Sequence, residues 1–551
     1  MVKKWGRKFL WAAGTVMLLV PVGAFALNNG YARTPPMGFS TWNYFGCNGI
    51  NEANVMAVAQ SMVQIHAPNW EGKQISLQSV GYKFINLDDC WPATSRLADS
   101  APTWNTTKFS HGFPWLTDTI HKMGLKIGIY SCCGTATCAG YIGSYGYEKK
   151  DALTYVQWGF DYLKEDWCNV PSQYNNAAGS ATLYSRMGHA LAHADSIYYL
   201  DSLKADSNWT TAKADSMRKV HGITFSLCNW GGSLTPWLYG DTCGNLWRTT
   251  GDINASWSSI YGNWTTTIAL YSYAGPGGWN DPDMLEIGNG SLTNTVNQSH
   301  MDLWCICAAP LLMGNNTPAM SAATFTILSN REVIAVDQDS LGLQGHKART
   351  TGNIQVIVKP LLVHNPDTVN NKKFAVVILN ASTSAAAAGS IKWSDLGITD
   401  TSKQFRVRNL WLHRWLKSRS IIDTATPPDT METVSESLYV ASIPLEGTVH
   451  VLMEMGNPDS IPVTSVRPED YERVAAQLGN RMTIRGNEVF IPVGLSKLQV
   501  FDMKGREIAS VSASQPGWYS FSGRGVVHGG TYLIRLNTPA GAISRVVAFV
   551  K

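Results

Sequence analysis

The sequence predicts an α/β protein: a (β/α)8 TIM barrel, then an antiparallel β-sandwich, then a small all-β module at the C-terminus. Two observations predict the barrel. Eight short apolar runs recur between residues 37 and 314, and segments with helical spacing of apolar residues separate them. A third observation predicts the sandwich, because strand-like alternation continues after about residue 345 with no helical segment between the strands. The 551 residues are enough for several domains.

The expected barrel strands alternate with helices along the chain. In order, the strands are MGFSTW (37–42), YKFINLD (82–88), LKIGIYS (125–131), DYLKED (161–166), ITFSLCN (223–229), LWRTTGD (246–252), GGWNDPDM (277–284) and APLLMG (309–314). The clearest helical segments are NEANVMAVAQSMVQI (51–65), PWLTDTIHKMG (114–124) and KKDALTYVQWGF (149–160). In a barrel of this kind the active site lies at the C-terminal ends of the strands.

We expect the later strands to be antiparallel. They are NIQVIVKPLLVH (353–364), KKFAVVILNAS (372–382), QFRVRNLWLHRWL (404–416) and SLYVASIPLEGTVHVLMEM (437–455). We therefore expect a catalytic barrel over 27–345, a β-sandwich over 346–456, a linker over 457–470 and an all-β module over 471–551.

The first 26 residues are predicted to be a signal peptide. Four basic residues precede an apolar run that is too short to span a bilayer comfortably, and an A-x-A pattern follows at Ala24 to Ala26. We expect an exported protein, secreted or attached to the cell surface, with the periplasm as an alternative. No later segment is long and apolar enough to be transmembrane.

The composition argues against nucleic acid as a partner and is compatible with sugar binding. The net charge of +4 comes from 44 basic and 40 acidic residues and is too small and too evenly spread for a nucleic-acid binder. The chain holds 21 Trp and 21 Tyr, whose flat faces suit the apolar faces of sugars, although packing in the core explains them equally well. All ten cysteines lie between residues 47 and 307, which places any disulfides in the barrel.

Acidic residues follow four of the expected strands. They are Asp88 and Asp89, Asp166, Asp252, and Asp281 with Asp283. Acids that meet at one barrel mouth repel one another unless cations or substrate hydroxyls satisfy them, and Lys164 and Arg248 are placed to do so. No His cluster or zinc-spaced Cys pair accompanies them, so we expect no cofactor, with a calcium site as an alternative. Carboxylate pairs without a metal indicate glycoside hydrolysis.

The stretch YLKEDWC holds two adjacent acids, of which one can face the barrel mouth. Side chains alternate along a strand, so Lys164, Asp166 and Cys168 share one face. Glu165 and Trp167 share the other face, toward the helices. We expect Lys164 to lower the pKa of Asp166, and we expect Glu165 to need a cationic or hydrogen-bonding partner.

Ten ordered motifs resemble glycoside hydrolase family 27, the α-galactosidase and α-N-acetylgalactosaminidase family. They are ARTPPMGFSTWNYFGCN, INLDDCW, GIYS, TCAGYIGSYGYE, YLKEDWC, SLCNWGG, WRTTGDI, GPGGWNDPDML, AAPLLMG and EVIAVDQDSLGLQG. The resemblance covers residues 33 to about 455 in order.

This resemblance implies a retaining hydrolase with Asp166 as nucleophile and Asp252 as general acid/base. It also implies a sugar-binding set, which comprises Trp42, Asp88, Asp89, Tyr130, Lys164, Asn229, Arg248, Asp283 and Met284. Retention requires the two carboxyl groups to be roughly 5 to 5.5 Å apart, and we expect less cationic surroundings for the acid than for the nucleophile. Each residue also has a structural alternative: Asp88 or Asp89 as a helix cap, Arg248 as a surface ion-pair partner.

The resemblance further implies three disulfides, which pair Cys47 with Cys90, Cys138 with Cys168, and Cys228 with Cys243. Cys305 and Cys307 are expected to be buried free thiols, whereas the adjacent Cys132 and Cys133 have no assigned role.

The predicted function is that of an exo-acting α-galactosidase that releases terminal α-galactose from oligosaccharides, galactomannans or glycoconjugates. Alternatives on the same site are β-L-arabinopyranosidase and α-N-acetylgalactosaminidase, and an alternative of another class is a non-catalytic galactose-binding protein. The tail resembles a type IX secretion sorting domain through LQVFDMKGR, GGTYLIRL and VVAFVK, which makes the secretion machinery an expected partner. A small carbohydrate-binding module is the alternative for the tail.

Overall fold

The computed structural model describes residues 29–66, 69–205, 222–363, 372–400, 403–416, 431–434 and 437–455, together with seven strands of the C-terminal module. The expected signal peptide and the expected linker at 457–470 lie outside the described residues.

Eight parallel strands form the first sheet. They are β1 (Met37–Ser40), β2 (Phe84–Asn86), β3 (Lys126–Cys132), β4 (Tyr162–Asp166), β5 (Thr224–Cys228), β6 (Leu246–Arg248), β7 (Trp279–Asp281) and β8 (Leu311–Met313). Their spatial order is β7-β6-β5-β4-β3-β2-β1-β8. The segment after β7 bridges in parallel from Leu285 to Met313 of β8, so the two ends of the sheet meet. All eight expected strands are therefore confirmed, and with them the barrel class.

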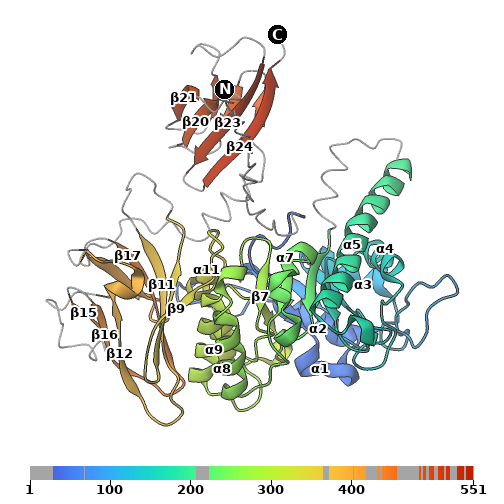
Figure 1. The fold of residues 1–551 in the computed structure, drawn as a ribbon, viewed down its shortest axis with the longest axis horizontal. Helices are drawn as coiled ribbons and strands as arrows, with labels where there is room; N and C mark the ends of the chain where they lie inside the picture. Colours follow the sequence, from blue (N-terminus) through green and yellow to red (C-terminus); the bar gives the residue numbers. More distant parts are fainter. Residues whose placement is uncertain are drawn as a thin grey trace, which may run out of the picture.

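Helices follow the strands and surround the barrel (Figure 1). They are α1 (Trp42–Gly49), α2 (Glu52–Val63), α3 (Phe113–Lys122), α4 (Glu148–Trp158), α5 (Ala177–Ala205), α7 (Gly240–Cys243), α8 (Trp257–Ile268), α9 (Asn294–Ile306), α10 (Ala322–Leu328) and α11 (Arg331–Asp337). Polar caps set several starts, since the side chains of Asn51, Ser256 and Ser321 accept hydrogen bonds from backbone N–H groups of α2, α8 and α10. The three helices expected from apolar spacing are α2, α3 and α4.

Two antiparallel sheets follow the barrel and form the sandwich. The larger has the order β14-β13-β17-β11-β10-β9, and the smaller has the order β12-β16-β15. Their strands are β9 (His346–Thr351), β10 (Ile354–Pro360), β11 (Lys373–Asn380), β12 (Ala387–Lys392), β13 (Phe405–Asn409), β14 (Arg414–Trp415), β15 (Met431–Val434), β16 (Ser437–Ile443) and β17 (Thr448–Met455). A separate apolar cluster, which includes Val356, Val376, Leu438 and Val451, forms the core of this unit.

The sandwich lies against α9 of the barrel (Figure 1). Oδ2 of buried Asp302 on α9 accepts hydrogen bonds from Thr448 (2.6 Å) and Trp411 (3.0 Å), and Oδ1 lies 2.7 Å from His450 Nδ1. A buried carboxylate with this many partners is well compensated for its loss of water, so the contact is specific as well as apolar.

The described strands of the C-terminal module are all antiparallel. They are β18 (Thr483–Arg485), β19 (Glu488–Ile491), β20 (Ser496–Phe501), β21 (Glu507–Ala513), β22 (Gly517–Ser520), β23 (Gly530–Thr538) and β24 (Gly541–Phe549). Their pairings give two sheets, β18-β19-β22 and β21-β20-β23-β24, as the all-β prediction requires.

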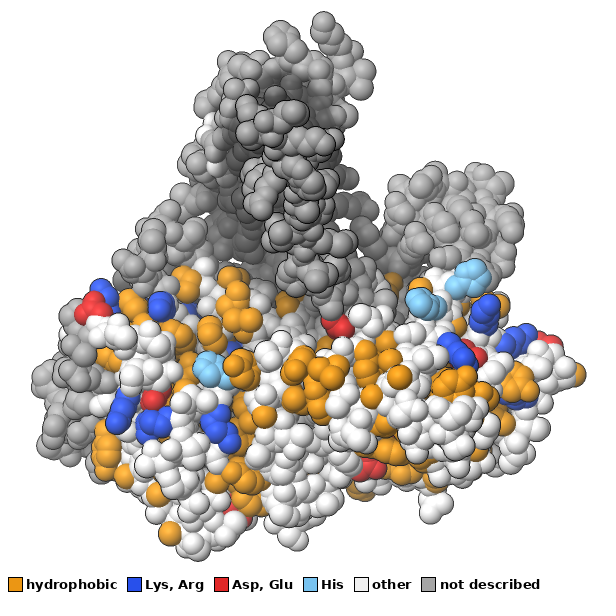
Figure 2. Space-filling model, in the orientation of Figure 1, with side chains coloured by type: hydrophobic (Ala, Val, Ile, Leu, Met, Phe, Trp, Pro, Cys, Tyr) orange, Lys and Arg blue, Asp and Glu red, His pale blue; other side chains and the backbone are white. Residues whose placement is uncertain are grey.

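The face of the molecule shown in Figure 2 carries few charges. On the face shown in Figure 2, Lys and Arg side chains form small separated groups between broad uncharged areas. In the part of the chain that the structure describes, no helix combines the length and the apolar character needed to cross a bilayer.

Candidate active site

Asp166, the last residue of β4, lies in the buried mouth of the barrel. Its Oδ2 accepts a hydrogen bond from the Tyr130 hydroxyl at 3.1 Å, and its Oδ1 accepts one from the Trp167 backbone N–H at 2.8 Å. Lys164 Nζ lies 4.0 Å from Oδ2. The predicted sharing of one strand face by Lys164 and Asp166 therefore holds, and the two donors fix the carboxyl group in one orientation.

Burial has the largest effect on this carboxyl group and raises the pKa of Asp166 to about 6. Lys164 and the Trp167 N–H act in the opposite direction, as does Arg248, but they do not offset the loss of water. We expected Lys164 to lower this pKa. Its contribution has that sign, yet the net shift is upward because Asp166 itself is buried.

Lys164 connects Asp166 of β4 to the segment after β2, which lies on the other side of β3. Its Nζ lies 2.9 Å from Asp88 Oδ2. Burial alone would lower the pKa of Lys164, but Asp88 and the other anionic groups raise it well above its ordinary value. The two oxygens of Asp89 accept hydrogen bonds from the backbone N–H groups of Cys90 (2.6 Å) and Ala139 (2.8 Å). Asp88 is held as well, because its Oδ1 accepts a hydrogen bond from the Asp89 backbone N–H at 2.9 Å.

Arg248, the last residue of β6, gathers the acids on the other side of the mouth. Its NH2 lies 3.0 Å from Asp252 Oδ1 and 3.1 Å from Asp283 Oδ2. Arg248 is 3% exposed, and it also donates to the Thr250 carbonyl at 3.1 Å. Asp283 in turn accepts from the Ile253 backbone N–H at 2.9 Å. Arg248 is thus buried, and it fixes the loop after β6 instead of forming an ion pair at the surface.

Asp252 differs from the other acids in its exposure. Its side chain is 67% exposed, and its one charged partner within salt-bridge distance among the described residues is Arg248. The less cationic surroundings that we expected for a general acid are therefore absent: the guanidinium of Arg248 contacts this carboxylate directly.

The remaining predicted binding residues border the same mouth. Trp42 begins α1, directly after β1, and Met284 is 5% exposed behind β7. Asn229 follows β5 and is 1% exposed; its amide donates to Ser180 Oγ at 2.9 Å and to the Tyr239 hydroxyl at 2.8 Å. Asn229 is thus held in a buried polar set with Ser180 and Tyr239.

Glu165 points away from the mouth, as the alternation along β4 predicts. It is 1% exposed, and its side-chain partner is the thiol of Cys133. Its Oε2 has no hydrogen-bond partner among the described residues. Burial raises the pKa of Glu165 well above its ordinary value, and the nearby acids Glu148 and Asp151 act in the same direction. The structure therefore gives Glu165 a thiol as its partner and not a cationic side chain.

Two of the three implied disulfides are present, Cys47–Cys90 and Cys138–Cys168. The second joins the loop after β3 to the end of β4, next to Asp166. Three ligand-type groups, Cys138, Cys168 and Asp166, come within 4.8 Å of one another there. Because the two sulfurs are bonded to each other, this cluster offers no thiolate to a metal ion.

The third implied disulfide is wrong, because Cys228 and Cys243 are both free and buried. Cys228 ends β5 and its Sγ lies 3.6 Å from Arg248 NH1, in the barrel mouth. Cys243 ends α7 and lies 3.2 Å from Ser185 Oγ on α5, outside the sheet. The two sulfurs therefore point to different sides of the sheet and cannot bond without movement of the backbone.

The other four cysteines are also free and buried. This confirms the prediction for Cys305 and Cys307. Cys132 donates to the Cys168 carbonyl at 2.9 Å, and Cys133 contacts Glu165 on the opposite side of β3.

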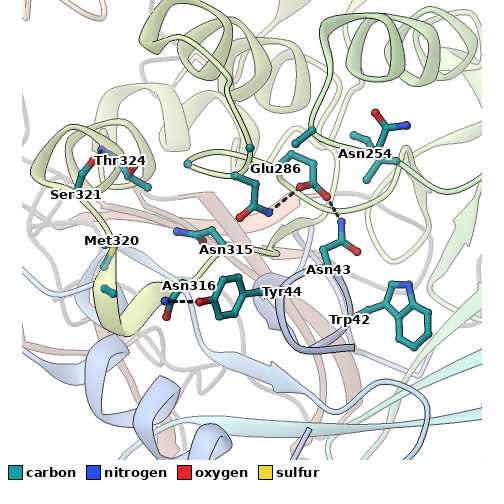
Figure 3. A pocket seen from close by; sticks show the side chains of 16 residues that line it. Trp42, Asn43, Tyr44, Asn254, Glu286, Asn315, Asn316, Met320, Ser321 and Thr324 are labelled. Carbon is teal, nitrogen blue, oxygen red and sulfur yellow. Dashed lines mark hydrogen bonds between the residues drawn. The ribbon is translucent and has the colours of Figure 1, made fainter. Parts of the chain in front are cut away.

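A set of amide side chains beside this mouth was not predicted from the acids at the strand ends. Asn43, Asn254, Asn315 and Asn316 line a pocket together with Glu286 (Figure 3). The sequence does hold a signal for them, because all four asparagines lie within three residues of a predicted strand end or a predicted acid.

Comparisons with known proteins show the family of this chain. The sequence model of the family described as alpha galactosidase A matches residues 34–339, and the model of the alpha galactosidase C-terminal beta sandwich domain matches residues 351–431. The chain is 38% identical to an alpha-galactosidase of Cyamopsis tetragonoloba, over 71% of this chain and 83% of that protein. It is 40% identical to an alpha-galactosidase of Coffea arabica, over 71% of this chain and 90% of that protein. Alpha-galactosidase I of Mortierella vinacea superposes with a TM-score of 0.63 at 30% identity, over 77% of this chain and 98% of that one.

Proposed function

Because the chain belongs to the alpha-galactosidase family of glycoside hydrolases, family 27, we propose that it releases terminal α-linked galactose with retention of configuration. Asp166 is the nucleophile and Asp252 the general acid/base. The observation that carries the proposal is Asp166 itself: a buried carboxyl group at a barrel strand end, held by two hydrogen bonds beside an ammonium group.

In the first step an Asp166 oxygen attacks the anomeric carbon from the β face, while Asp252 gives its proton to the glycosidic oxygen and the leaving alcohol departs. In the second step the Asp252 carboxylate takes a proton from water, and the water oxygen displaces Asp166. Galactose leaves in the α configuration, and both carboxyl groups return to their starting states.

The neighbours of the two acids support these roles. Tyr130 and the Trp167 N–H aim the oxygens of Asp166, and Lys164 bridges Asp166 and Asp88, which offers an acceptor to the sugar hydroxyls. Asp252 is exposed, so a leaving group can lie within reach of its carboxyl group.

Specificity is tested with aryl glycosides that share one leaving group. The α-galactoside should give the highest kcat/KM, ahead of the α-N-acetylgalactosaminide and the β-L-arabinopyranoside. A tenfold preference for the arabinopyranoside, about 1.4 kcal/mol, would contradict the assignment. Proton NMR of the first sugar released decides the stereochemistry, since retention gives α-galactose before mutarotation.

We also propose that the enzyme is exported through residues 1–26 and that the tail serves secretion or surface attachment. The two disulfides are consistent with an oxidising compartment. A chain that ends at Asn457 should keep full activity on aryl substrates and lose export or attachment. Loss of activity in a folded truncated chain would instead assign the tail to the catalytic unit.

A further inference from the structure

The outer side of α5 carries two histidines one turn apart. His189 and His193 lie at positions i and i+4 of this helix, and both side chains are exposed. Among the 12 histidines of the sequence, they are the two that lie closest together along the chain. Side chains at this spacing are neighbours on a helix surface, with Cβ atoms roughly 5 to 6 Å apart. The two imidazole rings therefore leave the helix on one face and can reach a common point.

Packing of the opposite side of α5 fixes the direction of this face. The buried residues of the helix recur at spacings of one, three and four and join the barrel core; they are Leu183, Tyr184, Met187, Ala190, Leu191 and Ala194. The Tyr184 hydroxyl also donates to the Glu165 carbonyl at 3.2 Å. The helix packs beside α4 on the outside of the barrel (Figure 1). Rotation of α5 would expose this apolar stripe, so His189 and His193 stay directed toward solvent.

The ring nitrogens of both histidines are available as ligands. Neither ring has a hydrogen bond, an ion pair or a ring contact with another residue in the part of the chain that the structure describes. By contrast, His111 contacts Glu52 at 2.6 Å and His121 contacts Asp161 at 2.8 Å. A neutral imidazole offers a nitrogen lone pair and is the commonest metal ligand in proteins.

Arg186, which lies on the same face of α5, is turned away from the pair. It stands three residues before His189, and it donates to the Tyr174 hydroxyl at 3.0 Å. Its guanidinium carbon lies 5.2 Å from the centre of the Tyr174 ring. Because Tyr174 precedes the helix and side chains tilt toward the helix N-terminus, this positive charge is held on the side away from His193. A cation can therefore approach the two imidazoles.

We propose that His189 and His193 bind one divalent transition-metal ion of the class that prefers nitrogen ligands, which includes Ni²⁺, Cu²⁺ and Zn²⁺. The rings supply two ligands. Water takes the other positions, because no third His, Cys, Asp or Glu among the described residues forms a cluster with them. The site lies outside the candidate active site and does not depend on the proposed function. The bound ion links two successive turns of α5 and thereby stabilises the folded chain.

Titration of the full chain with nickel chloride, after treatment with a chelator and dialysis, tests the site by calorimetry and by thermal unfolding. The parent chain should bind Ni²⁺ saturably, and its unfolding temperature should rise with Ni²⁺ concentration. His189→Ala and His193→Ala should each weaken binding by about tenfold or more. The double variant should bind no more weakly than either single variant, because one remaining ring cannot chelate. Without metal, all the variants should unfold at the temperature of the parent, since the replaced side chains are exposed.

The matched control is His111→Ala, because His111 is also exposed but contacts Glu52. It should leave Ni²⁺ binding unchanged. Cu²⁺ should displace Ni²⁺, whereas an excess of Mg²⁺, which prefers oxygen ligands, should not.

Three results would overturn the proposal: no saturable binding by the parent chain, binding that both single variants retain, or loss of binding in His111→Ala. Losses that add in the double variant would also contradict it, since they would show that each histidine binds metal separately.

Discussion

Replacing Asp166 by Asn should stabilise the folded protein at neutral pH while it removes the nucleophile. Burial raises the pKa of Asp166 from 3.8 to about 6. The difference is about 2 units at 1.36 kcal/mol per unit, so the ionised carboxylate lowers the free energy of unfolding by about 3 kcal/mol. Asn has nearly the same shape and stays neutral, and the Tyr130 hydroxyl can accept from its amide instead of donating.

The upward direction of the Asp166 pKa shift determines the pH range over which this group affects stability. The folded state holds the Asp166 proton more tightly than the unfolded state does, so the stability from this group is complete below about pH 4 and is lost as the pH rises to about 6. Thermal unfolding of the parent chain and of Asp166→Asn, measured from pH 4 to pH 8, should therefore coincide at the acid end. By pH 7 the variant should unfold several degrees higher.

The control is Asp118→Asn, because Asp118 is 60% exposed and far less affected by burial. It should shift unfolding by at most about 0.5 kcal/mol at either pH. If Asp166→Asn were less stable than the parent at pH 7, Lys164 and the two hydrogen bonds would outweigh burial, and the reasoning would be refuted.

Three further predictions concern the same strand and its neighbours. Since Asp166 must be ionised to attack, kcat/KM on an aryl α-galactoside should fall below a pH of about 6 with slope one, and a flat profile down to pH 4.5 would contradict this assignment. Glu165→Gln should keep kcat within about tenfold and raise the thermal midpoint at pH 7, because burial raises the pKa of Glu165 and its ionisation then costs stability above the ordinary pKa; a hundredfold loss of kcat would give Glu165 a catalytic role. Mass spectrometry of the unfolded, alkylated chain should find Cys228 and Cys243 as free thiols, and a peptide in which they are joined would show that the third disulfide forms after all.

Most of the fold was predictable because periodicity records which face of each element is buried. The eight barrel strands are short apolar runs with polar ends, and they lie where those runs stand in the sequence. Closure of the barrel was not visible in the same way. It uses Leu285, which lies beyond the end of β7 and pairs as an isolated bridge with Met313.

The site was predictable where residues share a strand and less so where burial decides. Alternation along β4 separated Asp166 from Glu165 correctly. The alternation could not show that Asp166 is buried enough for its pKa to rise, because burial depends on side chains from the other strands as well. The pairing of Cys228 with Cys243 failed for a related reason: spacing along the chain does not reveal that the Cys228 sulfur lies beside Arg248 in the mouth and the Cys243 sulfur beside Ser185 of α5.

The central claim, that Asp166 is the nucleophile, is tested most directly by azide rescue of Asp166→Gly with an activated aryl α-galactoside. Azide fills the space of the lost carboxylate and attacks the anomeric carbon from the β face, so release of the aryl alcohol should recover with azide concentration and NMR should identify β-galactosyl azide. Glu165→Gly serves as the matched variant and should show no such rescue. Rescue in Glu165→Gly, with Asp166→Asn still active, would contradict the account and assign the chemistry to the other acid.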